Sequence, residues 1–222
     1  MGAAVAAYAS LADVYEFLTP EALLTPTGSF AAFASVVEGP RVLDCACGIG
    51  LLAAGLFERG FDVQASDASP EMIRRTSAYG VPARVCRWED LEPSGGFDTV
   101  LCVGNSLPHA RYRLAALRGM AGALKPGGRL VLTSRNWDRE QQDERYEVER
   151  DGRRALVTYV WSGNDVDIAV RVDGETIAEQ LTFWPFTHET LLTELGAVGL
   201  RLEQSTWEPE AARYLVIART GL

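Results

Sequence analysis

The sequence has very few of the side chains on which several enzyme classes depend. Its 222 residues include one lysine, Lys125, and two histidines, His109 and His188. No Gly-Lys-Ser/Thr follows a glycine loop and no H-E-x-x-H occurs, which excludes a Walker nucleotide site and that type of zinc site. Lys125 lies in "LKPGGRL", where a helix end is expected, so a catalytic Schiff-base lysine is also disfavoured.

Long apolar runs and concentrated positive charge are also missing. Twenty-one basic against 30 acidic residues give a net charge of -9 without a basic cluster, so we expect no nucleic-acid or membrane partner. No run approaches the roughly 18 apolar residues of a membrane span. No Lys or Arg precedes Arg41, so the basic start of a secretory signal is absent. The sequence therefore predicts a cytoplasmic protein, with homo-oligomer formation left open.

Cysteine is scarce and its spacing does not suit a metal. Cys45, Cys47, Cys86 and Cys102 lie in or beside apolar segments, and no second Cys or His pair accompanies Cys45 and Cys47 at zinc-like spacing. We therefore expect no metal site and interpret the four thiols as small packing residues.

What the sequence does contain is an alternation of strand-like and helix-like segments. Predicted helices at 51–60, 69–80 and 111–124 separate the predicted strands, with Ser69 and Pro70 marking one helix start. Alternation of this kind predicts an α/β fold with a doubly wound, mostly parallel sheet. The predicted strands of this part are 41–45, 62–67, 83–88, 97–103 and 129–134.

After Ser134 the pattern changes to an antiparallel one. Asp151-Gly152, Gly163-Asn164 and Asp173-Gly174 each separate β-rich segments, which predicts a meander of about four strands. The chain then returns to one helix and two strands, 201–207 and 212–219. We interpret 1–222 as a single domain in which 137–184 is an insertion that covers a site built by the main sheet, without a second core.

The stretch "VLDCACGIG" is the strongest candidate for a ligand loop. Gly48, Gly50 and Ala53 fit G-x-G-x-x-A, and Asp67 ends the next predicted strand, which is the outline of a dinucleotide site. Asp44, however, would repel a pyrophosphate placed at this turn. It would instead attract a sulfonium and an ammonium, and S-adenosylmethionine carries both, together with a ribose that Asp67 can bind.

With "VQASDAS" and "LKPGGRLVL", this stretch resembles motifs of the class I S-adenosylmethionine-dependent methyltransferases. The resemblance implies a Rossmann-like, seven-stranded, mostly parallel sheet with a last antiparallel strand. It places Gly48 and Gly50 near the methionine part of the cofactor and Asp67 on the ribose. Ile49 stands where the family usually has Thr or Ser, so one hydroxyl is missing.

Four segments are similar, in the order in which they occur in the chain, to segments of the glycine and glycine/sarcosine N-methyltransferase group: "CRWEDL", "FDTVLCVGNSLPHA", "SRNWD" and "TFWPFTHETLLTEL". The resemblance implies that the loop with Trp88, Glu89 and Asp90 holds the adenine and that 101–105 lines the reacting region. Asn105, His109 and Arg135 would face the acceptor, with Arg135 on a carboxylate. The implied cofactor site comprises Tyr8, Tyr15, Asp44, Ala46, Cys47, Gly48, Asp67, Ala68, Met72, Trp88, Glu89, Asp90, Val103 and Gly104.

The N-terminal segment both supports and departs from this resemblance. Tyr8 and Tyr15 are seven residues apart, on one face of a predicted helix, and related enzymes close the cofactor pocket with such a helix. We therefore expect 1–39 to form a helical lid. The glycine N-methyltransferases place an Arg here on the cofactor carboxylate, whereas this chain has none before Arg41; Tyr8, loop amides or a hydroxyl must replace it.

These observations predict an enzyme that methylates the amine of a small molecule, such as an amino acid or an amine-bearing secondary metabolite. Positioning would supply most of the catalysis, and His109, with an ordinary pKa near physiological pH, is the candidate base. An O-methyltransferase on a hydroxyl or carboxyl metabolite is the alternative. A nicotinamide oxidoreductase and a cofactor-binding protein without activity remain open.

Overall fold

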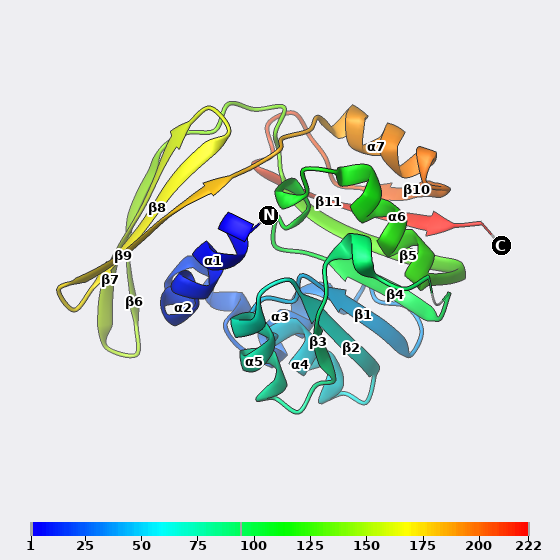
Figure 1. Cartoon of the computed structure of the whole chain (residues 1–222), viewed down its shortest axis with the longest axis horizontal. Helices are drawn as coiled ribbons and strands as arrows, with labels where there is room; N and C mark the ends of the chain where they lie inside the picture. Colours follow the sequence, from blue (N-terminus) through cyan, green and yellow to red (C-terminus); the bar gives the residue numbers. More distant parts are fainter. Residues whose placement is uncertain (1, 94, 222) are drawn as a thin grey trace.

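The structure is a computed structural model that describes residues 2–93 and 95–221. Its main body is a seven-stranded sheet in the order β10-β11-β5-β4-β1-β2-β3 (Figure 1). Only β11 runs against its neighbours, β5 and β10, so the predicted mostly parallel sheet is confirmed. The strands are β1 (Arg41–Cys45), β2 (Asp62–Asp67), β3 (Ala83–Val85), β4 (Phe97–Cys102), β5 (Leu124–Arg135), β10 (Leu200–Ser205) and β11 (Arg213–Thr220).

Helices cover both faces of this sheet because alternate residues of each central strand are apolar and buried. Val42 of β1 packs with Leu56 on the side of the helices α3 (Pro26–Phe33) and α4 (Leu51–Phe57). Leu43, the next residue, packs with Met120 on the other side, which α6 (Arg113–Ala123) and α7 (His188–Ala197) cover. The helix α5 (Pro70–Ser77) lies beside α4 and next to β2 and β3.

The helix starts follow the capping rules read from the sequence. Ser69 accepts a hydrogen bond from the Met72 N–H at 3.4 Å and Pro70 takes the first helical position, as predicted. Thr187 caps α7 in the same way, through the N–H of Thr190. These caps fix where α5 and α7 begin relative to the sheet.

The predicted bounds of β3 and β5 differ most from the structure. The strand expected over 83–88 ends at Val85, because the chain turns into the 3-10 helix η3 (Trp88–Asp90). The strand expected over 129–134 already begins at Leu124, which is extended and pairs with Phe97 across an irregularity in the register. η3 thereby reaches the carboxyl edge of the sheet, where the candidate site lies.

The strand order creates a crevice at that edge. β1 lies between β2 and β4, so the connections that leave β1 and β4 go to opposite sides of the sheet. Open α/β sheets bind ligands at this topological switch point. The glycine loop follows β1, and 103–109 follow β4, including the 3-10 helix η4 (Leu107–His109).

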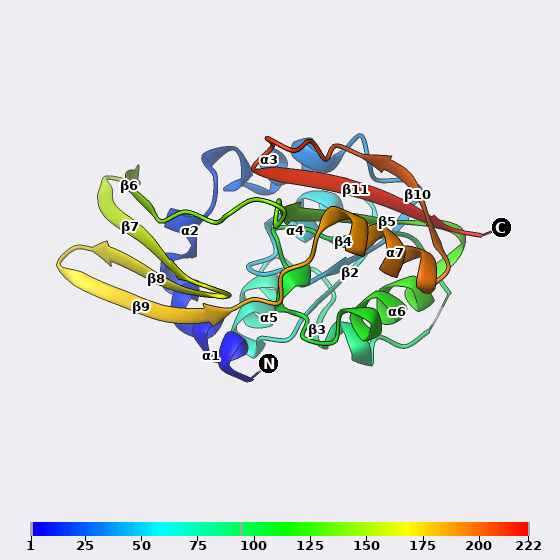
Figure 2. The same cartoon turned by 90° about the horizontal axis from the view of Figure 1, so that it is seen from above.

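A separate four-stranded antiparallel sheet forms the predicted meander. Its hairpin turns fall at Asp151-Gly152, Gly163-Asn164 and Asp173-Gly174, as predicted, and Asp151 and Asp173 adopt the positive φ of such turns. Figure 2 shows this sheet at one end of the molecule. The strands are β6 (Glu144–Arg150), β7 (Arg153–Ser162), β8 (Asp165–Val172) and β9 (Glu175–Thr182).

The N-terminal helices lie between the meander and the main sheet (Figures 1 and 2). Leu11 and Phe17 pack with Val157 and Val170 of the meander in a cluster of their own, so the expectation of no second core is wrong. The predicted continuous helix carrying Tyr8 and Tyr15 is also wrong. It is divided into α1 (Gly2–Leu11), the 3-10 helix η1 (Ala12–Val14) and α2 (Tyr15–Leu18), followed by a further 3-10 turn, η2 (Glu21–Leu23).

Within the part of the chain that the structure covers, no helix combines the length and apolar character needed to cross a membrane.

Candidate active site

The glycine loop between β1 and α4 has the backbone conformation that its glycines allow. Gly48 and Gly50 have φ values of 57° and 82°, and Gly50 is the N-cap of α4. A Cβ on Gly50 would lie 2.6 Å from Thr76 Oγ1, so packing requires glycine there. A Cβ on Gly48 would meet only the Tyr15 hydroxyl, at 3.8 Å, so the Gly48 backbone borders open space.

Asp67 holds this loop and the start of α5 together. Its Oδ2 accepts from the Gly48 N–H at 3.0 Å and its Oδ1 accepts from the Ser69 N–H at 2.8 Å. Burial raises the pKa of Asp67, while these N–H donors act in the opposite direction. The carboxylate therefore lies at the end of β2, partly neutralised by backbone donors and next to the loop that follows β1.

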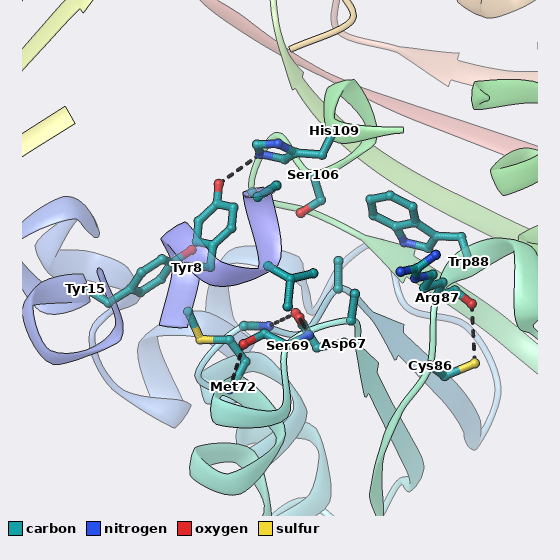
Figure 3. Close-up of a pocket in the computed structure, with 16 residues that line it drawn as sticks. Tyr8, Tyr15, Asp67, Ser69, Met72, Cys86, Arg87, Trp88, Ser106 and His109 are labelled. Carbon is teal, nitrogen blue, oxygen red and sulfur yellow. Dashed lines mark hydrogen bonds between the residues drawn. The ribbon is translucent and has the colours of Figure 1, made fainter. Parts of the chain in front are cut away.

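A cavity with an empty volume of about 740 Å³, its open side included, lies over these two loops (Figure 3). Most of the predicted cofactor residues line it: Tyr8, Tyr15, Ala46, Gly48, Asp67, Ala68, Met72, Trp88 and Gly104. Sequence reasoning missed Ser69, Cys86, Arg87 and Ser106 as lining residues.

His109 lies on the wall of this first cavity and is bonded to Tyr8. The Tyr8 hydroxyl is 2.9 Å from His109 Nε2 (Figure 3). The imidazole also packs against Phe183, with ring centroids 4.5 Å apart. Burial lowers the pKa of His109 to about 4. The expected pKa near physiological pH is therefore wrong, because the sequence gives no measure of the burial that disfavours the imidazolium.

Several buried polar atoms of the site have no hydrogen-bond partner among the described residues. They include both carboxylate oxygens of Asp44, the indole nitrogen of Trp88 and Nδ1 of His109. Burial, and to a smaller extent the charge of Asp67, raise the pKa of Asp44 to about 7. Unpaired buried polar atoms are costly, so a ligand that offers hydrogen-bond donors and acceptors to these groups would compensate them.

A second cavity adjoins the first. Tyr15, Ala46, Gly48, Gly104 and Ser106 line both cavities and form the boundary between them. Three predicted cofactor residues, Asp44, Cys47 and Val103, line the second cavity rather than the first. A ligand in the first cavity can therefore reach an acceptor in the second only across this boundary.

Arg135 lines the second cavity, where the sequence places the acceptor. Its guanidinium donates to Glu144 Oε1 at 2.9 Å and to Gln141 Oε1 at 3.4 Å, and lies 5.5 Å from the ring centre of Trp161. Asn105 lines neither cavity. It is 8% exposed, and its Oδ1 accepts from the Arg135 N–H at 2.9 Å. Its contact is thus with the strand that carries Arg135.

Several other predicted residues do not lie where the sequence analysis placed them. Glu89 and Asp90 follow Trp88 on η3 but line neither cavity, and Leu101 is fully buried in the core. His109 lines the first cavity, whereas the resemblance implied a position facing the acceptor. His188 contacts Ser205 at 3.0 Å and stacks on Trp207.

Metal binding has no support in the arrangement of side chains. Over residues 2–93 and 95–221, no group of three or more His, Cys, Asp or Glu side chains is placed to hold an ion.

Residues 42–128 match the family described as "Methyltransferase domain". Glycine N-methyltransferase of Rattus norvegicus is 38% identical over 121 residues, which cover 44% of this chain and 41% of that protein. A ubiquinone biosynthesis O-methyltransferase of Xanthomonas euvesicatoria pv. vesicatoria (strain 85-10) is 41% identical over 108 residues, covering 45% of each. The chain thus spans less than half the length of these curated relatives.

A solved structure extends the likeness to nearly the whole chain. S-adenosylmethionine-bound CalS10, described as an amino pentose methyltransferase from Micromonospora echinaspora involved in calicheamicin biosynthesis, superposes with a TM-score of 0.75. It is 20% identical and the match covers 93% of this chain and 94% of that one, so it shows the shared fold. In the matched segment, in its relatives and in its fold, the chain is thus similar to S-adenosylmethionine-dependent methyltransferases.

Proposed function

We propose that the protein transfers a methyl group from S-adenosylmethionine to a nitrogen of a small molecule. The observation that carries this proposal is the pair of adjoining cavities, which meet at Gly48, Gly104 and Ser106. The first cavity has side chains that suit a positively charged nucleoside. The second cavity has the room and the polar groups to bind a methyl acceptor. The boundary is where the reacting atoms would meet.

The residues of the first cavity fit this cofactor. Asp67 can accept hydrogen bonds from ribose hydroxyls, and the aromatic and apolar faces of Trp88 and Met72 suit an adenine. The open backbone at Gly48 allows close approach of the methionine part. When bound, S-adenosylmethionine supplies a methyl group activated by a sulfonium centre and leaves as the neutral thioether S-adenosylhomocysteine.

Asp44 supports a cationic ligand over a dinucleotide. Its carboxylate is 1% exposed, has no hydrogen-bond partner among the described residues and lies just before the glycine loop. A pyrophosphate there would add negative charge to a buried carboxylate, whereas an ammonium or sulfonium would neutralise it. The Tyr8 hydroxyl contacts His109, and the Tyr15 and Ser106 hydroxyls, together with loop amides, are further donors for the cofactor carboxylate.

His109 offers no strong base to an oxygen acceptor, because it lines the first cavity and burial lowers its pKa, and this supports nitrogen as the acceptor atom. With a pKa of about 4 and Nε2 bonded to Tyr8, its imidazole is a weak base. A neutral amine attacks without strong base catalysis and releases its proton afterwards, whereas a hydroxyl needs its proton removed by a base. The role of the site is then to hold the amine in line with the methyl group, at about 3 Å.

An O-methyltransferase is the second candidate, because the relatives include one. Asp44, with a pKa of about 7 and a place on the wall of the second cavity, is the group that could act as a base there. Within nitrogen acceptors we propose an amino acid or an amine-bearing natural product, in keeping with the names of the other two similar proteins.

The test is a panel of amines and the matching alcohols, incubated with S-adenosylmethionine and examined by mass spectrometry. We expect amines to gain one or more methyl groups and the matching alcohols to remain unchanged. Methylation of the alcohols alone would replace the nitrogen proposal with the oxygen one. Failure to bind S-adenosylhomocysteine would reject both.

A further inference from the structure

The second cavity is long, and the strand β6 forms one of its walls. Side chains on alternate residues of a strand point to the same side. Glu144, Tyr146, Val148 and Arg150 alternate in this way, and all four line the cavity. Six residues of an antiparallel strand extend over about 20 Å. The cavity wall therefore runs from a near end at Glu144 to a far end at Arg150.

The near end lies at the edge of the main sheet. Glu144 accepts from Arg135 of β5 at 2.9 Å, and Arg213, which pairs with Arg135 in the antiparallel register, also lines the cavity. Gly104, at the boundary with the first cavity, donates its N–H to Thr133 Oγ1 of the same strand β5 at 2.8 Å. Methyl transfer at this boundary would therefore use only the near end.

The second cavity is much larger than the first. Its empty volume is about 2060 Å³, its open side included, against about 740 Å³ for the first cavity on the same basis. The first cavity is the one proposed to hold all of S-adenosylmethionine. A small acceptor at the boundary would therefore leave most of the second cavity open to water.

The far end presents apolar side chains that are incompletely covered. Leu18 and Leu23, from the N-terminal segment, and Val148 of β6 line the cavity and are only half-buried. The short helix α2, which ends at Leu18, lies against β6 and β7. Removal of such apolar surface from water is favourable. This part of the cavity therefore suits the apolar body of a long molecule.

Arg150 ends this wall with hydrogen-bond donors that are poorly used. Its side chain is 18% exposed, and its Nε is buried without a hydrogen-bond partner among the described residues. It contacts Glu21 of η2 at 3.8 Å, but the Glu21 side chain is 86% exposed. Buried donors that lack a partner are costly. An oxygen atom of a ligand at the far end would therefore be favoured as an acceptor for Arg150.

We propose that the far end of the second cavity is a binding subsite for the distal part of an elongated methyl acceptor. The acceptor is then a long, mainly apolar amine. Its nitrogen lies at the boundary between the cavities, its body follows β6, and an oxygen group at its other end accepts from Arg150. Leu23 and Arg150 are specificity-determining residues that select acceptors by length. This inference rests on the proposed function, because it describes the acceptor of that same site.

The experiment varies the length of the amine and the group at its far end. Butylamine, dodecylamine, 12-aminododecan-1-ol, 12-aminododecanoate and 4-aminobutanoate are titrated, at concentrations where they do not aggregate, into protein saturated with S-adenosylhomocysteine. Calorimetry measures the affinities. We expect dodecylamine to bind at least about tenfold more tightly than butylamine, because its added methylenes are buried. The long acid or the long alcohol should bind more tightly still, and the tighter of the two shows whether Arg150 prefers an anionic or a neutral oxygen.

Two variants with matched controls locate the effect. Leu23→Asp should remove the advantage of dodecylamine over butylamine, whereas Leu202→Asp, at a 47% exposed leucine of β10, should keep it. Arg150→Gln should weaken binding of 12-aminododecanoate about tenfold, as loss of a charged hydrogen bond predicts, and change that of 4-aminobutanoate by less than about twofold. Arg145→Gln, at an exposed arginine of the same strand, should change neither.

Four results would overturn the inference. They are no gain in affinity with chain length, no advantage of the long acid or alcohol over dodecylamine, equal losses in Leu23→Asp and Leu202→Asp, and an equal effect of Arg150→Gln on the long and the short acid. S-adenosylhomocysteine binding, measured first, separates these failures from failure of the proposed function. A protein that binds S-adenosylhomocysteine without preferring long amines lacks the subsite, whereas one that does not bind it contradicts the proposed function.

Discussion

Asn105 Oδ1 accepts a 2.9 Å hydrogen bond from the backbone N–H of Arg135, which joins the segment after β4 to the end of β5. Asn105 adopts φ of 67°, in the left-handed region that asparagine tolerates better than most residues. Its backbone N–H also donates to Thr133 O at 3.2 Å. The residue is thus a buried link between these two segments, and we expect it to act as a positioning residue for the proposed acceptor site.

Replacing Asn105 should damage the acceptor site more than the cofactor site. Asn105→Ala leaves the Arg135 N–H without its acceptor, and we expect the free energy of unfolding to fall by about 1–3 kcal/mol. KM for the acceptor should rise, while S-adenosylhomocysteine affinity stays within about twofold, because Asn105 lines neither cavity. Asn105→Asp, which retains the acceptor oxygen, is the matched control. An alanine variant with an unchanged acceptor KM would refute the positioning role.

Gly50 should be required because a side chain there would collide with Thr76, and this effect can be separated from the strain of its positive φ. Gly50→Ala forces both a positive φ and contact with Thr76, whereas Gly60→Ala forces a similar φ, 83°, with no atom within 4 Å. Backbone strain alone costs about 1–3 kcal/mol at such positions. We therefore expect Gly60→Ala to be destabilised within that range and Gly50→Ala to be destabilised further and to bind S-adenosylhomocysteine more weakly.

Urea unfolding of the two variants and calorimetry with S-adenosylhomocysteine provide the comparison. Equal losses of stability in both would mean that the contact with Thr76 is unimportant and that φ alone selects glycine.

Asp44 should make the stability of the ligand-free protein fall with rising pH. Its pKa is raised from the ordinary 3.8 to about 7, so between these values the folded state holds a proton that the unfolded state has released. The free energy of unfolding therefore decreases as pH rises through this range. Asp44→Asn removes the effect, and its stability relative to the natural protein should increase by about 2–3 kcal/mol between pH 5 and pH 8.

His109 should make the free energy of unfolding depend on pH in the opposite direction. Its pKa is lowered from 6.5 to about 4, so between these values the unfolded state binds the extra proton and the free energy of unfolding rises with pH. His109→Asn should therefore lose relative stability as pH rises from 4 to 6.5. Urea unfolding at several pH values measures both variants. A stability difference for Asp44→Asn that does not change with pH would contradict an unpaired buried carboxyl.

Tyr8 should tie the N-terminal helix to the site. Tyr8→Phe removes the hydroxyl that lies 2.9 Å from His109 Nε2, and we expect a loss of about 0.5–1.5 kcal/mol in the free energy of unfolding. S-adenosylhomocysteine should bind several-fold more weakly, since Tyr8 and its helix line the first cavity. Tyr112→Phe, at a side chain 68% exposed, is the control and should change neither quantity. If Tyr8→Phe bound S-adenosylhomocysteine with normal affinity, this contact of the N-terminal helix would not contribute to closing the first cavity.

The features that the sequence predicted well are those set by local chemistry. The bounds of β1 and β2 and the three meander turns follow from apolar runs and from Asp-Gly and Gly-Asn pairs. The start of α5 follows from Ser69 and Pro70. The candidate ligand loop could be predicted because glycines and acids cluster at a strand end, and this pattern can be recognised in the sequence alone.

What the sequence could not predict depends on contacts between distant segments. The bond between Tyr8 and His109, and the pKa of His109, arise only when α1 packs over the segment after β4. The pairing of Arg135 with Arg213 requires β11 to insert between β5 and β10. The second core requires the N-terminal helices to meet the meander, which neither segment signals alone.

Titration of the protein with S-adenosylhomocysteine, with NAD in parallel, tests the central claim most directly. The site described predicts saturable binding of S-adenosylhomocysteine that is weakened by replacing Asp67 with alanine, and no binding of NAD. Tight binding of NAD with no response to S-adenosylhomocysteine would contradict the account.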